Sequence, residues 1–390
     1  MALLNYSASH AGVTVSQKTA LQVSAVFACV NVISGSLAML PINIMRQSER
    51  RREIVSGLPL AYALRHEMYP GLPAQNGWQS IIANLVLRGN GYGQIILNGN
   101  KQVSGIRPLE AGAMKWDSRL GKWLYHPVDG VKEEFTEAEI FHVRGPSLGG
   151  GLGLDAMRIA NEIIGLAIAL DTNAATFFGN NSRMGTVLEA ERSLPPEYRA
   201  ALEERLKEKH EGPANAHRSL ILENGLRFAT NRADNNQAQF DESRQRQVEE
   251  IARFFGVPPH KIGVQNNIPR ANAEEANLAF ITDTLGKYAT LIENTVNVKL
   301  LGKPSIIAGF YTKVNLGALL KGTLADRYKA FAIGRQWGWL SVNDIRETED
   351  LDPVENGDIY LQPVNMVEAG TVPEPEVSTA ETEPTTATDE

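Results

Sequence analysis

The feature that most constrains the fold of this chain is a pair of long amphipathic stretches, residues 239–255 and 274–301. A polar segment with three prolines separates them. In the first stretch Phe240, Val248 and Ile251 fall on one side at helical spacing. Gly256 then provides a C-terminal stop, and the two prolines that follow prevent continuation, because proline lacks an amide donor and clashes with the preceding turn. We therefore expect a helix that ends near residue 255.

The second stretch predicts an even longer helix. Leu278, Ile281, Leu285 and Tyr288 recur at spacings of three and four, with polar residues between them. A helix over this whole stretch would be about 42 Å long at the usual rise per residue. Such a length is typical of a spine or a subunit contact and not of a pocket for a small molecule.

The net charge of −7 arises from the C-terminal end of the chain. Residues 367–390 contain seven acids and no Lys or Arg, and without them the 38 basic residues face 38 acids. This tail is rich in Thr, Pro, Ala and Glu, a composition typical of a disordered segment. The neutral body argues against a dedicated tight DNA binder, which normally has a strong basic excess.

The length of 390 residues predicts two or three domains with a sizeable core. The single cysteine, Cys29, excludes an intrachain disulfide, fits a reducing cytoplasm and is expected to be a buried structural thiol. Residues 1–18 show no secretory signal. The charge-free residues 19–45 have the length of a membrane span, but their apolar residues form one stripe that ends at Pro41, which favours a buried helix of a soluble protein.

Short strands and helices are expected on either side of a glycine-rich connector at residues 145–153. Before it, helices are predicted at residues 24–40, 60–67 and 77–88, and strands at 42–47, 53–56, 94–97, 103–108, 114–117, 122–125 and 139–143. Asn98-Gly99 marks a tight hairpin turn. After the connector, we expect a helix at 155–178, a unit of one strand, one helix and two strands at 185–230, an extended segment at 305–314, and helices at 324–336 and 342–349.

One motif raises an enzymatic alternative. Residues 145–149 match the G-x-S-x-G pattern, so Ser147 could act as the nucleophile of a serine hydrolase, with His210, His217 or His260 as base. The nucleophile elbow requires a helix directly after the serine, whereas more glycines follow here. A chance match in a flexible connector is the favoured interpretation.

The other candidate groups give no catalytic set. No phosphate-binding glycine loop and no His/Cys spacing for a metal are present, so we expect no cofactor and no metal site. Arg244, Arg246 and Arg253 could face DNA or pair with acids of a neighbouring subunit, and the interleaved acids favour pairing. Trp337 and Trp339 could stack on bases, but packing in the core of the C-terminal helices is favoured.

Three phrases together resemble the portal proteins of tailed bacteriophages, in the HK97-like group. They are SAVFACVNVIS at residues 24–34, ARFFGVPPHKIG at 252–263, and QWGWLSVNDIRETEDLDPVENGD at 336–358. They occur in the order of the family, and the resemblance covers roughly residues 21–365. None of them is a catalytic motif, and the specificity lies in their combination.

The resemblance implies an α+β portal fold with these parts: an N-terminal β-rich wing (1–153), a stem helix (154–183), a small α/β clip (184–232), a second stem helix (233–258), a tunnel loop (259–273), a spine helix with a return to the wing (274–318), a helical crown (319–366) and a disordered acidic tail (367–390). It also implies a ring of about twelve subunits at one capsid vertex, without an active site and without a membrane. The partners would be double-stranded DNA, the terminase large subunit, major capsid and scaffolding proteins, and a head–tail adaptor. The ring would belong to the virion and be assembled in the host cytoplasm.

The loop between the two amphipathic helices is the candidate contact with DNA. Closure of a ring would bring all copies of this loop towards the axis, and its polar amides and single cation suit transient contact with a moving duplex. An ordinary surface loop is the alternative. The predicted channel residues are Val264, Gln265, Asn266, Asn267, Ile268, Pro269 and Arg270.

Overall fold

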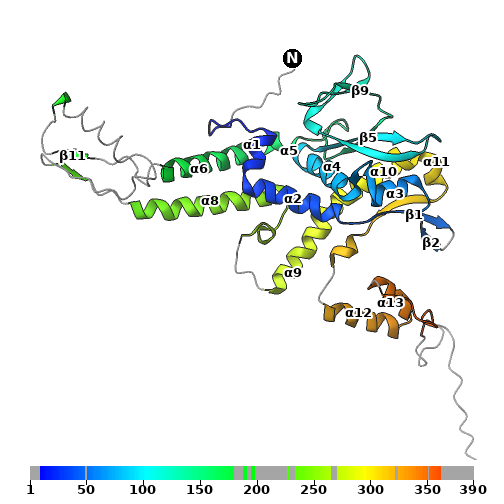
Figure 1. The fold of residues 1–390 in the computed structure, drawn as a ribbon. Helices are drawn as coiled ribbons and strands as arrows, with labels where there is room; N and C mark the ends of the chain where they lie inside the picture. Colours follow the sequence, from blue (N-terminus) through cyan, green and yellow to red (C-terminus); the bar gives the residue numbers. More distant parts are fainter. Residues whose placement is uncertain are drawn as a thin grey trace, which may run out of the picture. The chain divides into compact units, whose positions relative to one another are not determined.

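The computed structural model describes residues 9–48, 51–179, 188–190, 195–197, 226–228, 233–264, 270–320, 324–349 and 351–361. The chain forms two compact units, Met1–Leu319 and Leu320–Glu390. In the larger unit, helices pack on small antiparallel sheets, so the fold class is α+β, as predicted (Figure 1).

The core of the larger unit lies around two helices, α2 (Ser24–Ala38) and α4 (Ala74–Arg88), which pack on each other. The expected stripe of α2 is buried, including Val26, Val30 and Ile33, and the prediction of a buried helix is confirmed. Cys29 is buried too, and burial raises the pKa of its thiol to about 12. Among the described residues, no helix is both long and apolar enough to cross a membrane.

Short helices flank this core. Helix α1 (Gln17–Gln22), which the sequence patterns did not predict, begins at a capping box formed by Ser16 and Thr19. Helix α3 (Pro59–Arg65) carries proline at its start, where the missing N–H has no helical partner in any case. A two-stranded ribbon of β3 (Glu67–Tyr69) and β4 (Leu72–Pro73) joins α3 to α4.

Three antiparallel sheets surround the helices. One has the order β10–β5–β6, from Ile140–Arg144, Asn90–Leu97 and Val103–Leu109. The second has the order β13–β1–β2, from Phe310–Val314, Ile42–Ser48 and Arg51–Ile54. The third has the order β7–β8–β9, from Met114–Asp117, Lys122–Tyr125 and Glu133–Phe135, with the short helix η1 (Ala111–Ala113) before it. Strand β9 was not predicted.

The predicted hairpin between β5 and β6 is present. The Asn98 N–H donates to the carbonyl of Gln102, and Lys101, not Gly99, takes the left-handed conformation, with φ at 59°. The Asn98 side chain accepts from the N–H groups of Asn100 and Gln102. The predicted turn at Asn98-Gly99 is thus present, as part of a loop that the asparagine side chain stabilises.

Beyond the connector, two helices lie side by side. The predicted helix at 155–178 is divided into α5 (Ala156–Ile159) and α6 (Asn161–Gly179), and α8 (Ala233–Phe255) packs against α6 (Figure 1). Between α6 and α8, the described residues include strands β11 (Leu188–Ala190) and β12 (Leu226–Phe228), which pair antiparallel. The rest of the predicted unit at 185–230 lies outside the described residues.

The predicted long helix is continuous and contains two π-helical segments. It consists of α9 (Arg270–Ala279), the π-helix η4 (Phe280–Leu285), α10 (Gly286–Val296) and the π-helix η5 (Asn297–Leu301). The segment at 305–314 was predicted to be extended throughout, which is wrong in its first half: α11 (Gly302–Ile307) is helical and only β13 is a strand. The larger unit ends near the short helix η6 (Leu316–Leu320).

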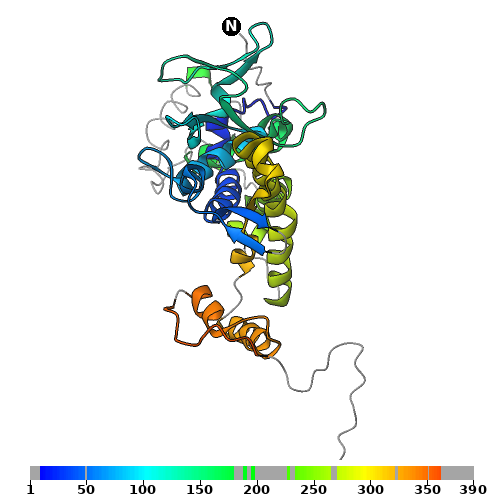
Figure 2. The same ribbon diagram turned by 90° about the vertical axis from the view of Figure 1, so that its right-hand side faces the viewer.

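The smaller unit contains α12 (Leu324–Gln336) and α13 (Val342–Thr348), both close to their predicted bounds (Figure 2). Ser341 and Asp344 form a capping box at α13. Trp337 and Trp339 are 46% and 71% exposed, so their predicted place in the core of this unit is wrong. Leu340 packs against Gly334 in place of the tryptophans. The contact is so close that a Cβ added to Gly334 would lie 2.7 Å from Leu340 Cδ1.

Candidate functional site

The turn after α8 is fixed to the long helix. Gly256 has φ at 68°, a left-handed conformation that favours glycine, and it ends α8 as predicted. The Thr284 hydroxyl of η4 donates to the Gly256 carbonyl at 2.7 Å. Val257 and Phe280 are both buried in the same core. The chain therefore leaves α8 in a defined direction.

The first part of the predicted channel loop continues this fixed turn. The short helix η3 (Pro259–Ile262) packs against α2, and the Val264 N–H donates to the Pro259 carbonyl at 3.1 Å. The Lys261 ammonium lies 5.8 Å from the centre of the Phe280 ring, within the range of a cation–π contact. His260 Nδ1 is buried without a hydrogen-bond partner among the described residues.

The predicted channel residues fall into three groups. Val264 is half-buried at the end of the fixed turn. Gln265, Asn266, Asn267, Ile268 and Pro269 lie outside the described residues. Arg270 is the first residue of α9, so its placement in the loop is wrong. Pro269 precedes it in the sequence, and proline is well tolerated at the start of a helix.

The arginines of α8 pair within their own chain. Arg244 Nη2 lies 3.0 Å from Asp171 Oδ1 of α6, and Arg246 Nη2 lies 2.6 Å from Glu242 Oε1. Arg253 forms an ion pair with Glu250. These arginines pair with acids of their own chain, and pairing with acids of a neighbouring subunit stays a prediction. The pairs are largely exposed, so each contributes little to stability.

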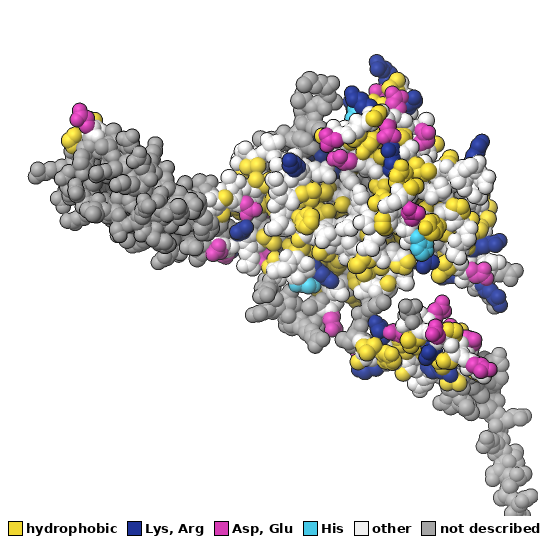
Figure 3. Space-filling model, in the orientation of Figure 1, with side chains coloured by type: hydrophobic (Ala, Val, Ile, Leu, Met, Phe, Trp, Pro, Cys, Tyr) yellow, Lys and Arg dark blue, Asp and Glu magenta, His cyan; other side chains and the backbone are white. Residues whose placement is uncertain are grey.

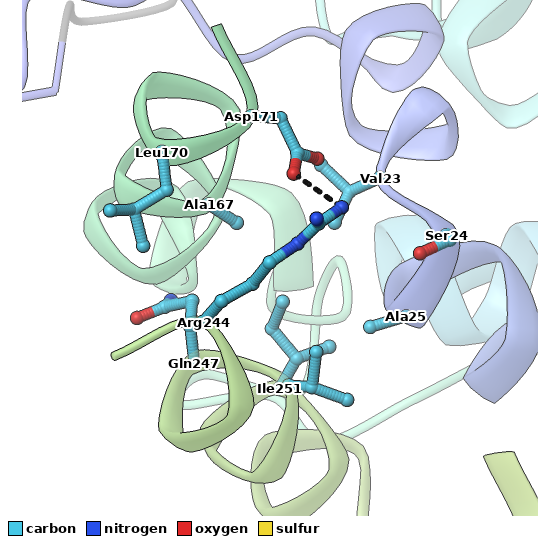
Figure 4. Close-up of a pocket in the computed structure, with 10 residues that line it drawn as sticks. Val23, Ser24, Ala25, Ala167, Leu170, Asp171, Arg244, Gln247 and Ile251 are labelled. Atoms are coloured by element: carbon cyan, nitrogen blue, oxygen red, sulfur yellow. Dashed lines mark ion pairs between the residues drawn. The ribbon is translucent and has the colours of Figure 1, made fainter. Parts of the chain in front are cut away.

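A small hollow lies where α6 and α8 meet the start of α2 (Figure 4). It encloses about 310 Å3 of space, part of which is open to solvent. The Arg244–Asp171 ion pair crosses it, and the Gln247 side chain beside it donates to the Ile163 carbonyl at 2.5 Å. The other residues that line it are Val23, Ser24, Ala25, Ala167, Leu170, Val248 and Ile251. Its mostly apolar walls offer no set of groups for catalysis.

The connector at 145–153 is closed at its base. The Asn90 side chain accepts from the Gly153 N–H and donates to the Gly153 carbonyl, at 2.9 and 3.0 Å. Gly89 and Gly153 lie so close that a Cβ on Gly153 would meet the Gly89 carbonyl oxygen at 1.9 Å. Asp155 caps α5 and forms an ion pair with Arg88 at 2.9 Å. The connector, predicted to be flexible, is thus a loop whose two ends are held together.

His142 is the centre of the polar network beneath this loop. Arg144 Nε donates to its Nδ1 at 3.1 Å, so its Nε2 carries the hydrogen and donates to Asn90 Oδ1 at 3.0 Å. Tyr92 stacks on the ring, with the centroids 4.3 Å apart. Burial and the charge of Arg144 lower the pKa of His142 to about 3. The histidine is therefore a neutral structural group.

Glu137 extends the network to the long helix. Its carboxylate accepts from Lys299 of η5 at 2.7 Å and from Trp123 Nε1 at 2.6 Å. Burial alone would raise the pKa of Glu137, but these hydrogen bonds and the nearby positive charges outweigh it and lower the pKa. The sequence showed no sign of this network, because its members are far apart in the chain and follow no period.

Ser147 does not lie on a nucleophile elbow. Strand β10 ends at Arg144, and the next helix, α5, begins only at Ala156. The elbow needs a tight strand-to-helix turn to hold the hydroxyl, and here the serine lies in the loop closed by Asn90. In the part of the chain that the structure describes, no group of three or more His, Cys, Asp or Glu side chains could hold a metal ion.

Two helices packed side by side, a fixed turn and a long helix, joined to a β-rich region and a small helical unit, define an α+β fold of the portal type. A solved HK97-family phage portal protein from Corynebacterium diphtheriae is 16% identical, with a TM-score of 0.56 over 78% of this chain and 97% of that one. The neck of a native gene transfer agent particle, computed with C12 symmetry, contains a chain that is 22% identical, with a TM-score of 0.57 over 87% and 94%.

Sequence similarity identifies the family. Residues 24–350 match the family described as phage portal protein. The portal protein of Enterobacteria phage HK97 is 30% identical, with 93% of this chain and 87% of that protein covered. The probable portal protein of Streptomyces phage phiC31 is 31% identical, with 93% and 82% covered. The chain belongs to the phage portal protein family.

Proposed function

We propose that this chain is the subunit of a ring that forms a DNA channel at one vertex of a phage capsid. The observation that carries the proposal is the fixed turn at residues 256–264, which joins the paired helices α6 and α8 to the long helix. It holds the start of the channel loop in the same place in every copy of a ring. The C12 symmetry of the related neck particle supports a ring of about twelve subunits.

In this proposal the β-rich region is the wing, α6 and α8 are the stem, residues 184–232 the clip, the helix from 274 the spine, and the C-terminal unit the crown. DNA is driven inward by the terminase large subunit and leaves through the same channel. Major capsid and scaffolding proteins contact the wing, and terminase or a head–tail adaptor contacts the clip. The ring is assembled in the host cytoplasm and remains in the virion, with no catalysis of its own.

Ring formation is tested by mass photometry and negative-stain imaging of the purified chain. We expect particles with a central hole at a mass of many subunits, because a neutral body can assemble around an axis without large self-repulsion. Monomers and dimers alone, at every salt and protein concentration, would contradict the ring. Labelling of Ser147 by an active-site serine probe would instead support the hydrolase alternative.

The channel loop is tested in assembled rings. Replacement of the loop residues 265–269 and of Arg270, at the start of α9, by a Gly/Ser linker should leave rings intact and impair packaging or retention of DNA, because the linker removes the amides and the cation that would contact phosphates. A matched control replaces residues 98–102 of the β5–β6 hairpin by a linker of equal length. Normal packaging by rings with the replaced channel loop would show that residues 265–270 have no role in the channel.

A further inference from the structure

The sheet of β13, β1 and β2 ends in a two-stranded ribbon. Strand β13 pairs with β1 no further than Arg46, whereas β2 pairs with β1 as far as the pair of Ser48 and Arg51. Strand β2 and residues 46–48 of β1 are together called the β1–β2 ribbon. Figure 2 shows β1 and β2 on the side of the larger unit that faces the viewer.

The described part of the ribbon carries more positive than negative charge. Arg46 and the whole of β2 are exposed. Arg51 and Arg52 form no ion pair with any residue that the structure describes. Glu53 lies across from Arg46 and offsets part of the charge. Residues 49–50, a Glu and an Arg, lie outside the described residues, and their charges cancel.

The cations of the ribbon lie on both of its faces. Arg51 pairs with Ser48, and Arg52 pairs with Gln47. Because successive residues of a strand face opposite sides, Arg51 and Arg52 lie on opposite faces of the ribbon. Arg46 is two positions from Ser48 and therefore shares the face of Arg51. The ribbon thus presents positive charge in two opposite directions.

Further positive charge lies beside the ribbon. The Gln47 N–H donates to the carbonyl of Gly309, just after α11, so α11 with its exposed Lys303 ends next to the ribbon. The Arg46 guanidinium lies 5.4 Å from the centre of the Phe310 ring at the start of β13. Figure 3 shows Lys and Arg side chains at the edge where Figure 1 places β2 and α11.

A partner of this ribbon must carry negative charge on both sides of it. One extended acidic peptide along a face or an edge would reach the cations of one face only. Duplex DNA differs, because phosphates follow both sides of each groove. The major groove is about 12 Å wide and admits a two-stranded β-ribbon, and several DNA-binding proteins use strands in this way.

We propose that the β1–β2 ribbon binds duplex DNA between the two phosphate chains of a groove, with Arg46 and Arg51 towards one chain and Arg52 towards the other. Contacts of this kind are independent of sequence. Few phosphates are neutralised, so binding is weak at physiological salt, in agreement with the neutral charge of the body. The site lies outside the channel loop. It rests on the proposed function only for the choice of DNA as the ligand, and it does not need a closed ring.

Fluorescence anisotropy of a short labelled duplex of mixed sequence, titrated with the purified chain, tests the site. At low salt, Arg51→Gln/Arg52→Gln should weaken binding about tenfold. It should also lower the slope of log K against log salt by about two, because two fewer phosphates are neutralised. Arg51→Lys/Arg52→Lys keeps both charges and should keep the slope. All four residues of β2 are exposed, so these variants should fold.

Single variants test the two-sided contact. Arg51→Gln and Arg52→Gln should each lower the salt slope by about one, because each arginine contacts its own phosphate chain. The matched control is Lys115→Gln/Arg119→Gln, the same charge change on the exposed β7–β8 hairpin, which should leave the slope unchanged.

Two further measurements separate this site from the ring and from the channel loop. Rings of Arg51→Gln/Arg52→Gln should assemble like those of the unchanged chain in mass photometry, because the ribbon is not needed for closure. In the chain with residues 265–270 replaced, the arginine pair should still lower the salt slope by about two. A failure to form rings would therefore contradict the proposed function and leave the result for the ribbon intact.

Three outcomes would overturn the proposal. The first is equal binding of the duplex by the unchanged chain and by Arg51→Gln/Arg52→Gln. The second is an effect of one arginine alone, which would mean a contact on one face. The third is displacement of the duplex by a glutamate-rich peptide at equal total charge, since the ribbon would then be a site for an acidic protein.

Discussion

Trp78 in the larger unit and Trp339 in the smaller one have opposite surroundings. Trp78 is 1% exposed, donates from Nε1 to the Leu64 carbonyl at 3.2 Å, and meets the Phe141 ring edge-on. Trp339 is 71% exposed. The Trp78 side chain is buried and hydrogen-bonded within its own chain, whereas Trp339 exposes a large apolar surface to water.

The helices show the same contrast. Helix α2 buries residues on several sides, whereas residues 241–246 of α8 are all exposed. On α12, Gly334 is the one buried residue that the structure records, although Tyr328 and Ile333 are large and apolar, as is Trp337 directly after the helix. Exposed apolar surface of this kind is common where a protein contacts a partner. Helix α2 thus buries most of its apolar side chains, whereas α12 leaves several of them exposed.

The largest expected effect comes from Trp78→Ala. Loss of a large buried ring and of its hydrogen bond should lower the free energy of unfolding by about 3–5 kcal/mol. Trp339→Ala, its matched control, should change this free energy by less than about 0.5 kcal/mol in the dilute subunit, because it removes few contacts. Denaturant midpoints measure both. Equal losses in the two variants would show that the smaller unit also has a closed core.

The second effect concerns the closed base of the connector. Gly153→Ala would place a Cβ against the Gly89 carbonyl, a backbone atom that cannot rotate away. We expect a loss of about 2–3 kcal/mol, in the upper range for overpacking. Gly151→Ala is the control, since nothing lies within 4 Å of its Cβ. An unchanged free energy of unfolding for Gly153→Ala would mean that the base of the loop is open in solution.

The spacing of apolar residues and the turn residues predicted those helices, strands and turns that neighbouring residues determine. The stripe of α2, the strands β7 and β8, the stop at Gly256 and the bounds of α12 were all predictable, because spacing and turn residues specify them. The contact of Asn90 with Gly153 was not, since it joins residues 63 positions apart and has no periodic signal.

The candidate site, too, was predicted only in part from the sequence. The proline-rich turn after α8 was predicted from its residues, but the bond from Thr284 that fixes it was not. The tryptophans were misjudged because apolar character was equated with burial, whereas Leu340 takes the place against Gly334. Apolar residues on an open helix are not distinguishable by composition from those in a core.

The third effect is a pH dependence caused by His142. Its pKa is lowered in the folded state, so it contributes stability above the unfolded value of about 6.5, and this contribution is lost as the pH falls towards 3. By pH 5 we expect a loss of about 1–2 kcal/mol. His142→Gln can still accept from Arg144 and donate to Asn90, so it should make the unfolding free energy less dependent on pH between 6.5 and 5. An unchanged slope would exclude His142 as the group that titrates.

The smallest effect is expected for the exposed arginines of α8. Arg244→Ala removes an ion pair between α6 and α8 and part of the wall of the hollow, whereas Arg246→Ala removes a pair within α8 alone. Both pairs are exposed, so each substitution should cost less than about 1 kcal/mol, with Arg244→Ala the larger because its aliphatic stem also packs. Denaturant unfolding at low and high salt measures both, and the ionic part should shrink with salt. A large loss for Arg244→Ala that persists at high salt would mean that packing around the hollow, and not charge, joins the two helices.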